Sequence, residues 1–366
     1  MQSVNVLVKP ASGNCNLRCR YCFYHDEMEH RTQATHGQMT DETLQAVVRG
    51  ALSYAKGTCT FGFQGGEPTL AGLGFFRRVV ELQKQYNVNN AAIHNAIQTN
   101  GTLLNDAWAA FFRENNFLVG LSIDGHESLH DLYRRDADGN GTHGRLMRAV
   151  KLLRTTGVDF NAVTVVTAQT AKNIRQAYAF FMRNGLLYQQ YIPCLDPIGE
   201  QRGRHQYSLT PALYARFLKT LFDLWYRDRA AGKFVYIRYF ENLAALLLGQ
   251  PPESCGISGV CSPQFAIEAD GTVYPCDFYM LDAYKLGNVH TSSFAQIEDN
   301  RRKSGFVQYS ARLPQPCKDC PVVYLCRGGC RRDRMNPGEN DSGTNYFCEA
   351  FREFFPYAAP RIKALL

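Results

Sequence analysis

Along the first half of the chain, short apolar runs alternate with stretches in which apolar residues recur every three or four positions. The periodic stretches predict amphipathic helices at residues 40–52, 73–86, 106–114, 143–156 and 171–184. The runs are rich in β-branched and aromatic residues, which predicts strands at residues 4–8, 59–64, 92–98, 118–123, 161–167 and 189–193. Six such strand–helix units with right-handed crossovers form a parallel α/β sheet. Their even spacing favours a partial, TIM-like (β/α)6 barrel over a flavodoxin-like open sheet.

The pattern changes after the sixth predicted strand. Apolar residues at helical spacing predict a long helix at 210–228, followed by a short strand at 234–238 and a helix at 241–248. A Gly-Gln-Pro-Pro stretch at 249–252 then marks the best candidate for a domain boundary. The chain is therefore expected to consist of a barrel at 1–207, a helical bridge at 208–250 and a small cysteine-rich domain at 251–366.

Composition narrows the class of protein. The chain has 366 residues, of which 45% are hydrophobic and 20% charged, as in ordinary globular proteins. It has no apolar run of membrane-spanning length and no signal-peptide pattern, so we expect a cytoplasmic protein with no membrane partner. Thirteen cysteines in a reducing compartment indicate metal ligands or catalytic groups, not a disulfide framework.

Positive charge gathers at one place only. The formal net charge is +7, and the Lys and Arg residues are spread evenly apart from a basic segment at 327–334. Such a segment most often forms a solvated face, so we expect no nucleic-acid partner. The polar stretch 334–344 is likewise expected at the surface.

Three cysteines follow the first predicted strand with the spacing C-x3-C-x2-C: Cys15, Cys19 and Cys22. Three thiolates leave a four-iron cluster one ligand short, and an open iron is where an exogenous molecule binds. A zinc site or buried core thiols are the alternatives. With an aromatic residue before its last cysteine, the motif resembles the cluster loop of radical S-adenosylmethionine enzymes. That resemblance implies that the open iron chelates the methionine part of S-adenosylmethionine.

Polar residues stand at the ends of the predicted strands, where barrel enzymes place their active sites. The second strand leads into Gly65, Gly66 and Glu67, whose backbone carbonyls and carboxylate could accept hydrogen bonds from an ammonium group. The resemblance implies that this loop, with Gly66, holds the methionine amino group. It further implies the following contacts: Tyr21 and Leu195 to adenine, Ser122 to ribose, and Arg134, or alternatively Arg135, to the methionine carboxylate.

The C-terminal part contains eight cysteines, which is two complete sets of four. Their spacing resembles the SPASM extension, an auxiliary-cluster domain, although two zinc ribbons would close with four thiolates equally well. The resemblance implies two auxiliary 4Fe-4S clusters, and three 4Fe-4S clusters in the whole chain. The ligands implied for them are Cys255, Cys261, Cys276 and Cys330 for one, and Cys317, Cys320, Cys326 and Cys348 for the other.

Asp277 directly follows one of these cysteines. Oxidising the Cβ of a Ser or Cys by two electrons gives a carbonyl or thiocarbonyl only if the heteroatom also loses a proton, which a carboxylate could accept. The alternative is an acid that caps a turn. Residues 274–279, with 63–73, 98–103 and 117–122, resemble anaerobic sulfatase-maturating enzymes. This resemblance, almost end to end, implies an oxidation to Cα-formylglycine in which a 5'-deoxyadenosyl radical removes hydrogen from Cβ, Asp277 is the base, and an auxiliary cluster accepts the electron.

The same resemblance implies the partners. The substrate would be an unfolded or nascent sulfatase with a Cys/Ser-x-Pro/Ala-x-Arg segment, reduced flavodoxin or ferredoxin would donate electrons, and the enzyme would be a monomer. The sequence does not decide between Cys and Ser. Two alternatives stay open: a SPASM maturase that crosslinks a ribosomal peptide, and a multi-cluster electron-transfer protein.

Overall fold

The computed structural model describes residues 3–334 and 343–366, and the chain divides into two compact units. Unit 1 comprises residues 1–122, 133–160 and 263–305, and unit 2 comprises residues 123–132, 161–262 and 306–366. Each unit joins segments that are distant in sequence, so the consecutive ranges 1–207, 208–250 and 251–366 stay a prediction. Most of the polar stretch expected at the surface lies outside the described residues.

Unit 1 is built on parallel strands. Strand β1 pairs in parallel with β2, β2 with β3, and β3 with β4. On the other side of β1, β8 pairs in parallel, and β9 and β10 continue the sheet antiparallel. The bounds are β1 (Val4–Val8), β2 (Thr58–Phe63), β3 (Ala92–Thr99), β4 (Phe117–Ser122), β8 (Phe265–Ile267), β9 (Thr272–Tyr274) and β10 (Gly287–Asn288). The first four strands lie within one residue of their predicted bounds.

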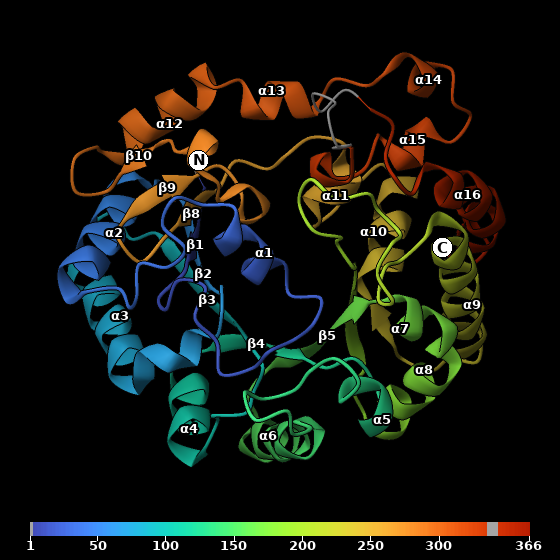
Figure 1. Ribbon diagram of the computed structural model, residues 1–366, viewed down its shortest axis with the longest axis horizontal. Coiled ribbons are helices and arrows are strands. Elements are labelled where there is room, and N and C mark those ends of the chain that lie inside the picture. The colour runs from blue at the N-terminus through green and yellow to red at the C-terminus, as the bar shows by residue number, and fades with distance from the viewer. Residues whose placement is uncertain (1–2, 335–342) are drawn as a thin grey trace. The chain divides into compact units, whose positions relative to one another are not determined.

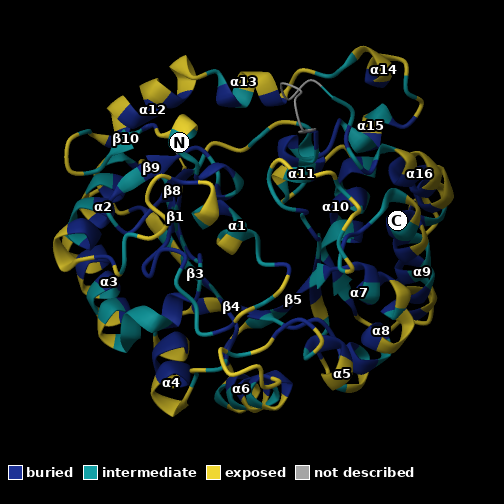
Figure 2. Ribbon diagram, viewed as in Figure 1, coloured by how far each residue is buried: buried dark blue, intermediate teal, exposed yellow. Residues whose placement is uncertain are grey.

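Helices cover the strands of unit 1. They are α1 (Phe23–Glu29), α2 (Asp41–Tyr54), α3 (Gly72–Tyr86), α4 (Asp106–Glu114), α6 (His143–Thr156) and α12 (Phe294–Lys303), with the 3-10 turns η1 (Pro68–Ala71), η2 (Asp277–Tyr279) and η3 (Asp282–Tyr284). Figure 1 shows α2, α3 and α4 along one side of the strands. Figure 2 shows the strands mainly as buried or intermediate, whereas the long helices carry exposed residues along one face. The helices therefore bury the apolar faces that their periodicity predicted.

Aromatic side chains form the core between these strands and helices. Phe76 of α3 packs edge-on against Phe63 of β2 and Trp108 of α4, with ring centroids 5.1 and 5.2 Å apart. Phe117, at the start of β4, joins them through Phe112. Because each ring buries a large apolar area, this cluster holds three consecutive strand–helix units together.

Unit 2 combines three strands with the remaining helices. Strands β5 (Phe160–Val166), β6 (Tyr188–Pro193) and β7 (Tyr236–Ile237) pair in parallel. The helices are α5 (Glu127–His130), α7 (Ala168–Lys172), α8 (Ile174–Arg183), α9 (Pro211–Ala230), α10 (Arg238–Leu247), α11 (Cys255–Ser258), α13 (Phe306–Ser310), α14 (Gln315–Lys318), α15 (Val323–Cys326) and α16 (Cys348–Lys363), with the 3-10 turn η4 (Arg331–Arg334). The helix predicted at 171–184 corresponds to α8, and Asn173 separates α8 from the short helix α7 that precedes it.

The long helix α9 packs against the C-terminal helix α16. Phe222 of α9 meets Phe354 of α16 at a centroid distance of 5.9 Å, and Asp223 accepts a hydrogen bond from Arg361 at 2.7 Å. Tyr214 at the start of α9 packs 4.6 Å from Phe347, next to Cys348. The last predicted cluster cysteine is thus anchored by the helix pair.

The parallel register brings the loops after β1, β2 and β3 to one edge of unit 1. Gly66, after β2, has φ +52°, and a Cβ there would lie 2.0 Å from the carbonyl oxygen of Asn14 in the loop after β1. The next residue, Glu67, donates its backbone N–H to the same oxygen at 2.8 Å. Only glycine fits this close approach of two backbones.

A buried ion pair joins α1 to the end of β8. Arg31 donates to the carboxylate of Glu268 at 2.6 Å, and both side chains are at most 2% exposed. Burial by itself would raise the pKa of Glu268, but the positive charges of Lys9 and Arg31 hold it below its usual value. The carboxylate is therefore ionised in the folded protein at neutral pH.

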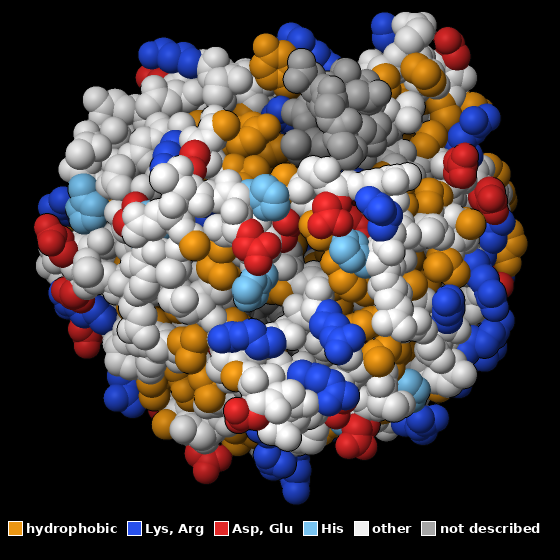
Figure 3. Space-filling view, in the orientation of Figure 1, with side chains coloured by type: hydrophobic (Ala, Val, Ile, Leu, Met, Phe, Trp, Pro, Cys, Tyr) orange, Lys and Arg blue, Asp and Glu red, His pale blue; other side chains and the backbone are white. Residues whose placement is uncertain are grey.

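The surface carries charges of both signs. Figure 3 shows Lys and Arg side chains interspersed with Asp and Glu over the face drawn, with hydrophobic groups scattered between them. Over the residues that the structure describes, no helix combines the length and the apolar character needed to cross a membrane.

We expect Gly66→Ala to destabilise the protein by about 2 kcal/mol or more, because the added methyl group strains a left-handed backbone and collides with Asn14. Anaerobic thermal unfolding measures this change. Gly74→Ala in α3 is the matched control, since a Cβ there meets no atom within 4 Å. Equal unfolding temperatures for Gly66→Ala and the parent would contradict the steric argument.

We expect Glu268→Gln to lower the free energy of unfolding by about 3 kcal/mol, because it leaves the buried guanidinium of Arg31 without its anion. Anaerobic denaturant unfolding provides the measurement. Asp41→Asn serves as the control: it breaks an exposed ion pair to Arg78 and should change the unfolding curve little. Equal changes in the free energy of unfolding for the two variants would show that burial does not strengthen the ion pair of Glu268.

Candidate active site

The loop with Cys15, Cys19 and Cys22 connects β1 to α1 and is held from both sides. Backbone N–H groups of Arg18 and Arg20 donate to carbonyls of Arg135 and Tyr133 at 2.7 and 3.2 Å. The three cysteines are partly exposed and form no disulfide. Hydrogen bonds to neighbouring segments therefore hold the loop in place.

Hydrogen-bond donors point at the sulfur of Cys15. The backbone N–H of Leu17 lies 3.3 Å from it and the amide of Asn100 lies 3.8 Å from it. Burial raises the pKa of the thiol to about 11, and the Leu17 N–H opposes that rise. N–H donors to sulfur are a feature of iron–sulfur thiolates, so this cysteine fits the implied cluster.

Across the described ranges, no three His, Cys, Asp or Glu side chains converge on a single metal-ion position.

Glu67 braces the loops around the glycine pair. Its carboxylate is fully buried and accepts hydrogen bonds from Thr69 N at 3.0 Å, Thr69 Oγ1 at 2.6 Å, Thr99 Oγ1 at 2.7 Å and Asn100 N at 2.7 Å. Oε1 accepts the three hydrogen bonds from Thr69 and Thr99, and Oε2 accepts the one from Asn100. The expected contact of this carboxylate with an ammonium group stays a prediction. The carboxylate ties the loop after β2 to the loop after β3.

Three of the residues expected around the cofactor, Tyr21, Ser122 and Arg134, lie in unit 1. Ser122, the last residue of β4, accepts a hydrogen bond from Gln98 at 3.0 Å. Arg134 is buried, and its guanidinium lies 5.4 Å from the ring centre of Tyr21 on the cluster loop. Arg135 is exposed and donates to the carbonyl of Gly139 instead. Of the two arginines, the geometry favours Arg134 as the carboxylate partner.

Leu195 lies two residues beyond the end of β6, in unit 2, and is half-buried. Its contact with adenine stays a prediction.

Asp277 is buried at the start of η2 and is held at one oxygen only. Its Oδ2 accepts from the hydroxyl of Tyr24 at 2.8 Å and from the amide of Gln64 at 2.7 Å. Its Oδ1 is buried with no hydrogen-bond partner. Burial raises the pKa of Asp277, while Lys9, Tyr24 and Gln64 counteract the rise. A turn cap would bond nearby N–H groups, whereas this carboxylate is oriented by side chains distant in sequence.

Sequence reasoning gave no role to the residues around Asp277. Lys9, 1% exposed, lies 3.5 Å from Glu27 and 4.5 Å from the ring centre of Tyr24. Tyr24 follows the cysteine motif and Gln64 precedes the glycine pair. Tyr24 and Gln64 both stand at the ends of predicted elements, and this was the signal available in the sequence. Only the fold shows that the two side chains converge on Asp277.

The cysteines of unit 2 gather in two groups. Neighbouring thiolates raise one another's pKa within each group, together with burial, which is the larger effect. The groups are Cys255, Cys261 and Cys330, and Cys317, Cys320, Cys326 and Cys348. The two expected ligand sets draw on these same groups, with Cys276 of unit 1 added to the first. Ligation itself stays a prediction.

The basic segment is not a solvated face, contrary to expectation. Arg331, Arg332 and Arg334 are all at least nine-tenths buried. Arg331 lies over the ring of Phe306 at 4.4 Å and donates to its carbonyl at 3.0 Å. The sequence pattern could not show this, because the apolar and carbonyl partners come from a different segment of the chain.

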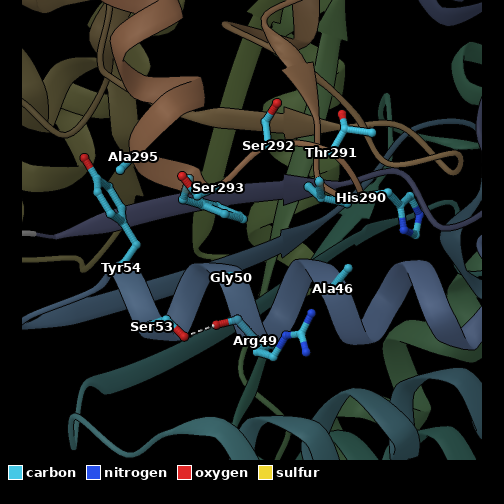
Figure 4. A pocket seen from close by; sticks show the side chains of 12 residues that line it. Ala46, Arg49, Gly50, Ser53, Tyr54, His290, Thr291, Ser292, Ser293 and Ala295 are labelled. Atoms are coloured by element: carbon cyan, nitrogen blue, oxygen red, sulfur yellow. Dashed lines mark hydrogen bonds between the residues drawn. The ribbon is translucent and has the colours of Figure 1, made fainter.

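A cavity of about 540 Å³ lies between α2 and residues 289–295. Figure 4 shows Arg49, Tyr54 and His290 around it. None of the predicted site residues lines it, so it is separate from the cysteine loop and Asp277.

Comparisons with known proteins place these features in a family. Residues 10–181 match the radical SAM superfamily, and residues 255–321 match the SPASM iron–sulfur cluster-binding domain. The chain is 45% identical to a cysteine-type anaerobic sulfatase-maturating enzyme of Clostridium perfringens (strain 13 / Type A), covering 99% of this chain and 98% of that protein. It is 34% identical to a serine-type enzyme of Bacteroides thetaiotaomicron, covering 97% and 89%.

A solved structure agrees with these relationships. Native anSMEcpe with bound AdoMet and Cp18Cys peptide matches the fold with a TM-score of 0.94 at 44% identity, covering 99% of this chain and 98% of that one. The expected α/β fold class with a SPASM region is therefore confirmed. The chain belongs to the anaerobic sulfatase-maturating enzymes, which are radical SAM oxidoreductases with a SPASM iron–sulfur cluster-binding domain.

Proposed function

We propose that this protein oxidises a Cys side chain of an unfolded or nascent sulfatase to Cα-formylglycine, with Asp277 as the proton acceptor. The observation that carries the proposal is the carboxylate of Asp277: buried, oriented through Oδ2 by Tyr24 and Gln64, and without a partner at Oδ1. When bound, the cofactors supply a 5'-deoxyadenosyl radical that removes hydrogen from Cβ, and a cluster that takes up the second electron.

The surroundings of Asp277 suit a base. Burial raises its pKa, which strengthens its attraction for a proton. The two donors at Oδ2 favour the ionised form and fix the carboxylate, and Oδ1 keeps its capacity to accept a proton because none of the residues that the structure describes bonds it. Proton loss from the thiol of the substrate then accompanies electron loss, and hydrolysis of the thiocarbonyl product gives the aldehyde.

Other residues would hold the cofactors. Cys15, Cys19 and Cys22 would hold the open cluster, and the eight further cysteines would hold two auxiliary clusters, giving three 4Fe-4S clusters. Gly66, Tyr21, Ser122, Arg134 and Leu195 would bind S-adenosylmethionine. The first four lie in unit 1, which also contains the cysteine loop, and this supports the proposal.

The sequence identities to the relatives bear on whether the enzyme oxidises a Cys or a Ser side chain. Cysteine-type enzymes are 45% identical to this chain, whereas the serine-type relative is 34% identical. We therefore infer that a Cys-x-Pro/Ala-x-Arg segment is preferred over its Ser counterpart. We further propose a cytoplasmic monomer that receives electrons from reduced flavodoxin or ferredoxin.

Two synthetic peptides that differ only in Cys or Ser at the modified position test the preference. We expect more aldehyde from the Cys peptide, because a thiol loses its proton more readily than a hydroxyl group. Mass spectrometry after anaerobic incubation with reduced enzyme and S-adenosylmethionine gives both yields. Faster Ser conversion would reject the preference, and a crosslinked product would favour the alternative peptide maturase.

Asp277→Asn keeps the size of the side chain and removes its basicity. We expect it to bind iron and cleave S-adenosylmethionine like the parent, while aldehyde formation falls by about 10²-fold to 10⁴-fold. Quantifying 5'-deoxyadenosine and aldehyde in the same reaction separates the two steps. The control is Asp282→Asn, which changes a more exposed carboxylate of the same segment that bonds Thr32. An unchanged aldehyde yield from Asp277→Asn would eliminate Asp277 as the base.

A further inference from the structure

The side-chain amide of Asn100 donates a hydrogen bond toward the first cysteine of the loop after β1. Asn100 directly follows β3, is 8% exposed, and has its Nδ2 3.8 Å from Sγ of Cys15. The backbone N–H of Leu17 approaches the same sulfur at 3.3 Å. Cys15 therefore has two N–H donors, one from the backbone and one that a substitution can remove.

A ring of hydrogen bonds fixes which end of the Asn100 amide faces the sulfur. Its Oδ1 accepts from the backbone N–H and the hydroxyl of Thr102, at 2.9 and 2.7 Å. Its Nδ2 donates to Oδ1 of Asn16 at 2.8 Å, and Nδ2 of Asn16 donates to Oγ1 of Thr102 at 2.9 Å, which closes the ring. The reverse orientation would place the Asn100 nitrogen against the N–H of Thr102. The second N–H of the amide is therefore left for Cys15.

Glu67 holds both the donor and the loop that carries the sulfur. Its Oε2 accepts from the backbone N–H of Asn100 at 2.7 Å. Its own backbone N–H donates to the carbonyl of Asn14, the residue before Cys15, at 2.8 Å. The approach of the amide to Cys15 is thus built into the fold of unit 1, because neither of these bonds involves the sulfur itself.

We propose that Asn100 raises the reduction potential of the open cluster through its N–H to the sulfur of Cys15. This inference rests on the proposed function, in which Cys15, Cys19 and Cys22 hold that cluster. It adds to that function a residue that sets how readily the cluster accepts an electron.

The physical reason lies in the charge on the sulfur. A cluster bound by thiolates becomes more negative when it gains an electron, and hydrogen bonds to its sulfurs are among the features that set its potential. An N–H donor bonds a more negative acceptor more strongly, above all in a buried place, so it stabilises the reduced form more than the oxidised form. The external donor, reduced flavodoxin or ferredoxin, loses one electron and the open cluster gains it. A higher potential favours this transfer.

The measurement is redox potentiometry of the full-length enzyme with all three clusters, followed by electron paramagnetic resonance. The signal that changes when S-adenosylmethionine is added belongs to the open cluster, because a cluster with four protein ligands has no open iron. Asn100→Ala removes the donor. Thr102→Val is the matched control: it breaks the same ring but leaves the Asn100 amide, which the backbone N–H of Thr102 still orients. The two auxiliary potentials are the internal control.

We expect Asn100→Ala to lower the potential of the open cluster alone, and Thr102→Val to leave all three potentials near those of the parent. If Asn100→Ala loses the open cluster, Asn100→Leu decides, because it fills the space of the amide without a donor. An unchanged potential, an equal shift in Thr102→Val, or an equal shift of all three clusters overturns the proposal. Loss of the open cluster from both Asn100 variants also overturns it, since Asn100 would then support the loop and not tune the cluster.

This experiment is separate from the test of the proposed function. No peptide is added, so a failed sulfatase assay leaves a lowered potential standing. A parent enzyme without any signal that responds to S-adenosylmethionine would instead contradict the assignment of the open cluster in the proposed function.

Discussion

The carboxylate of Glu67 is the interaction on which the site in unit 1 depends. It gathers four hydrogen bonds from the loops after β2 and β3, while its own backbone N–H bonds the loop after β1. The parallel register by itself would place the loops after β1, β2 and β3 side by side. These hydrogen bonds also tie the three loops to one another. The cysteine loop, the glycine pair and the amide of Asn100 keep fixed relative positions because of them.

Beside these loops, the protein interior contains buried charges of both signs. Lys9 and Arg31 are buried with three carboxylates, those of Glu27, Glu268 and Asp277. Two cations cannot neutralise three anions, so the cluster is balanced when one carboxyl group holds a proton. Burial raises the pKa of Glu27 to about 7, with Asp277 adding to the rise and Lys9 opposing it. Asp277 thus operates within a network whose other members compete for the same proton and the same cations.

The sequence by itself determined the strands, most helices, the cysteine spacing and the resemblance that led to the family, because periodicity and motif spacing are local properties. It also singled out Asp277, which stands next to a motif cysteine. It did not show that Glu67 braces the loops after β2 and β3, since a carboxylate beside glycines looks the same whether it binds a ligand or braces a loop. Only the tertiary structure brought Tyr24 and Gln64 to Asp277 and buried Arg331, Arg332 and Arg334. Burial and long-range hydrogen bonds depend on which segments meet, and no local pattern contains that information.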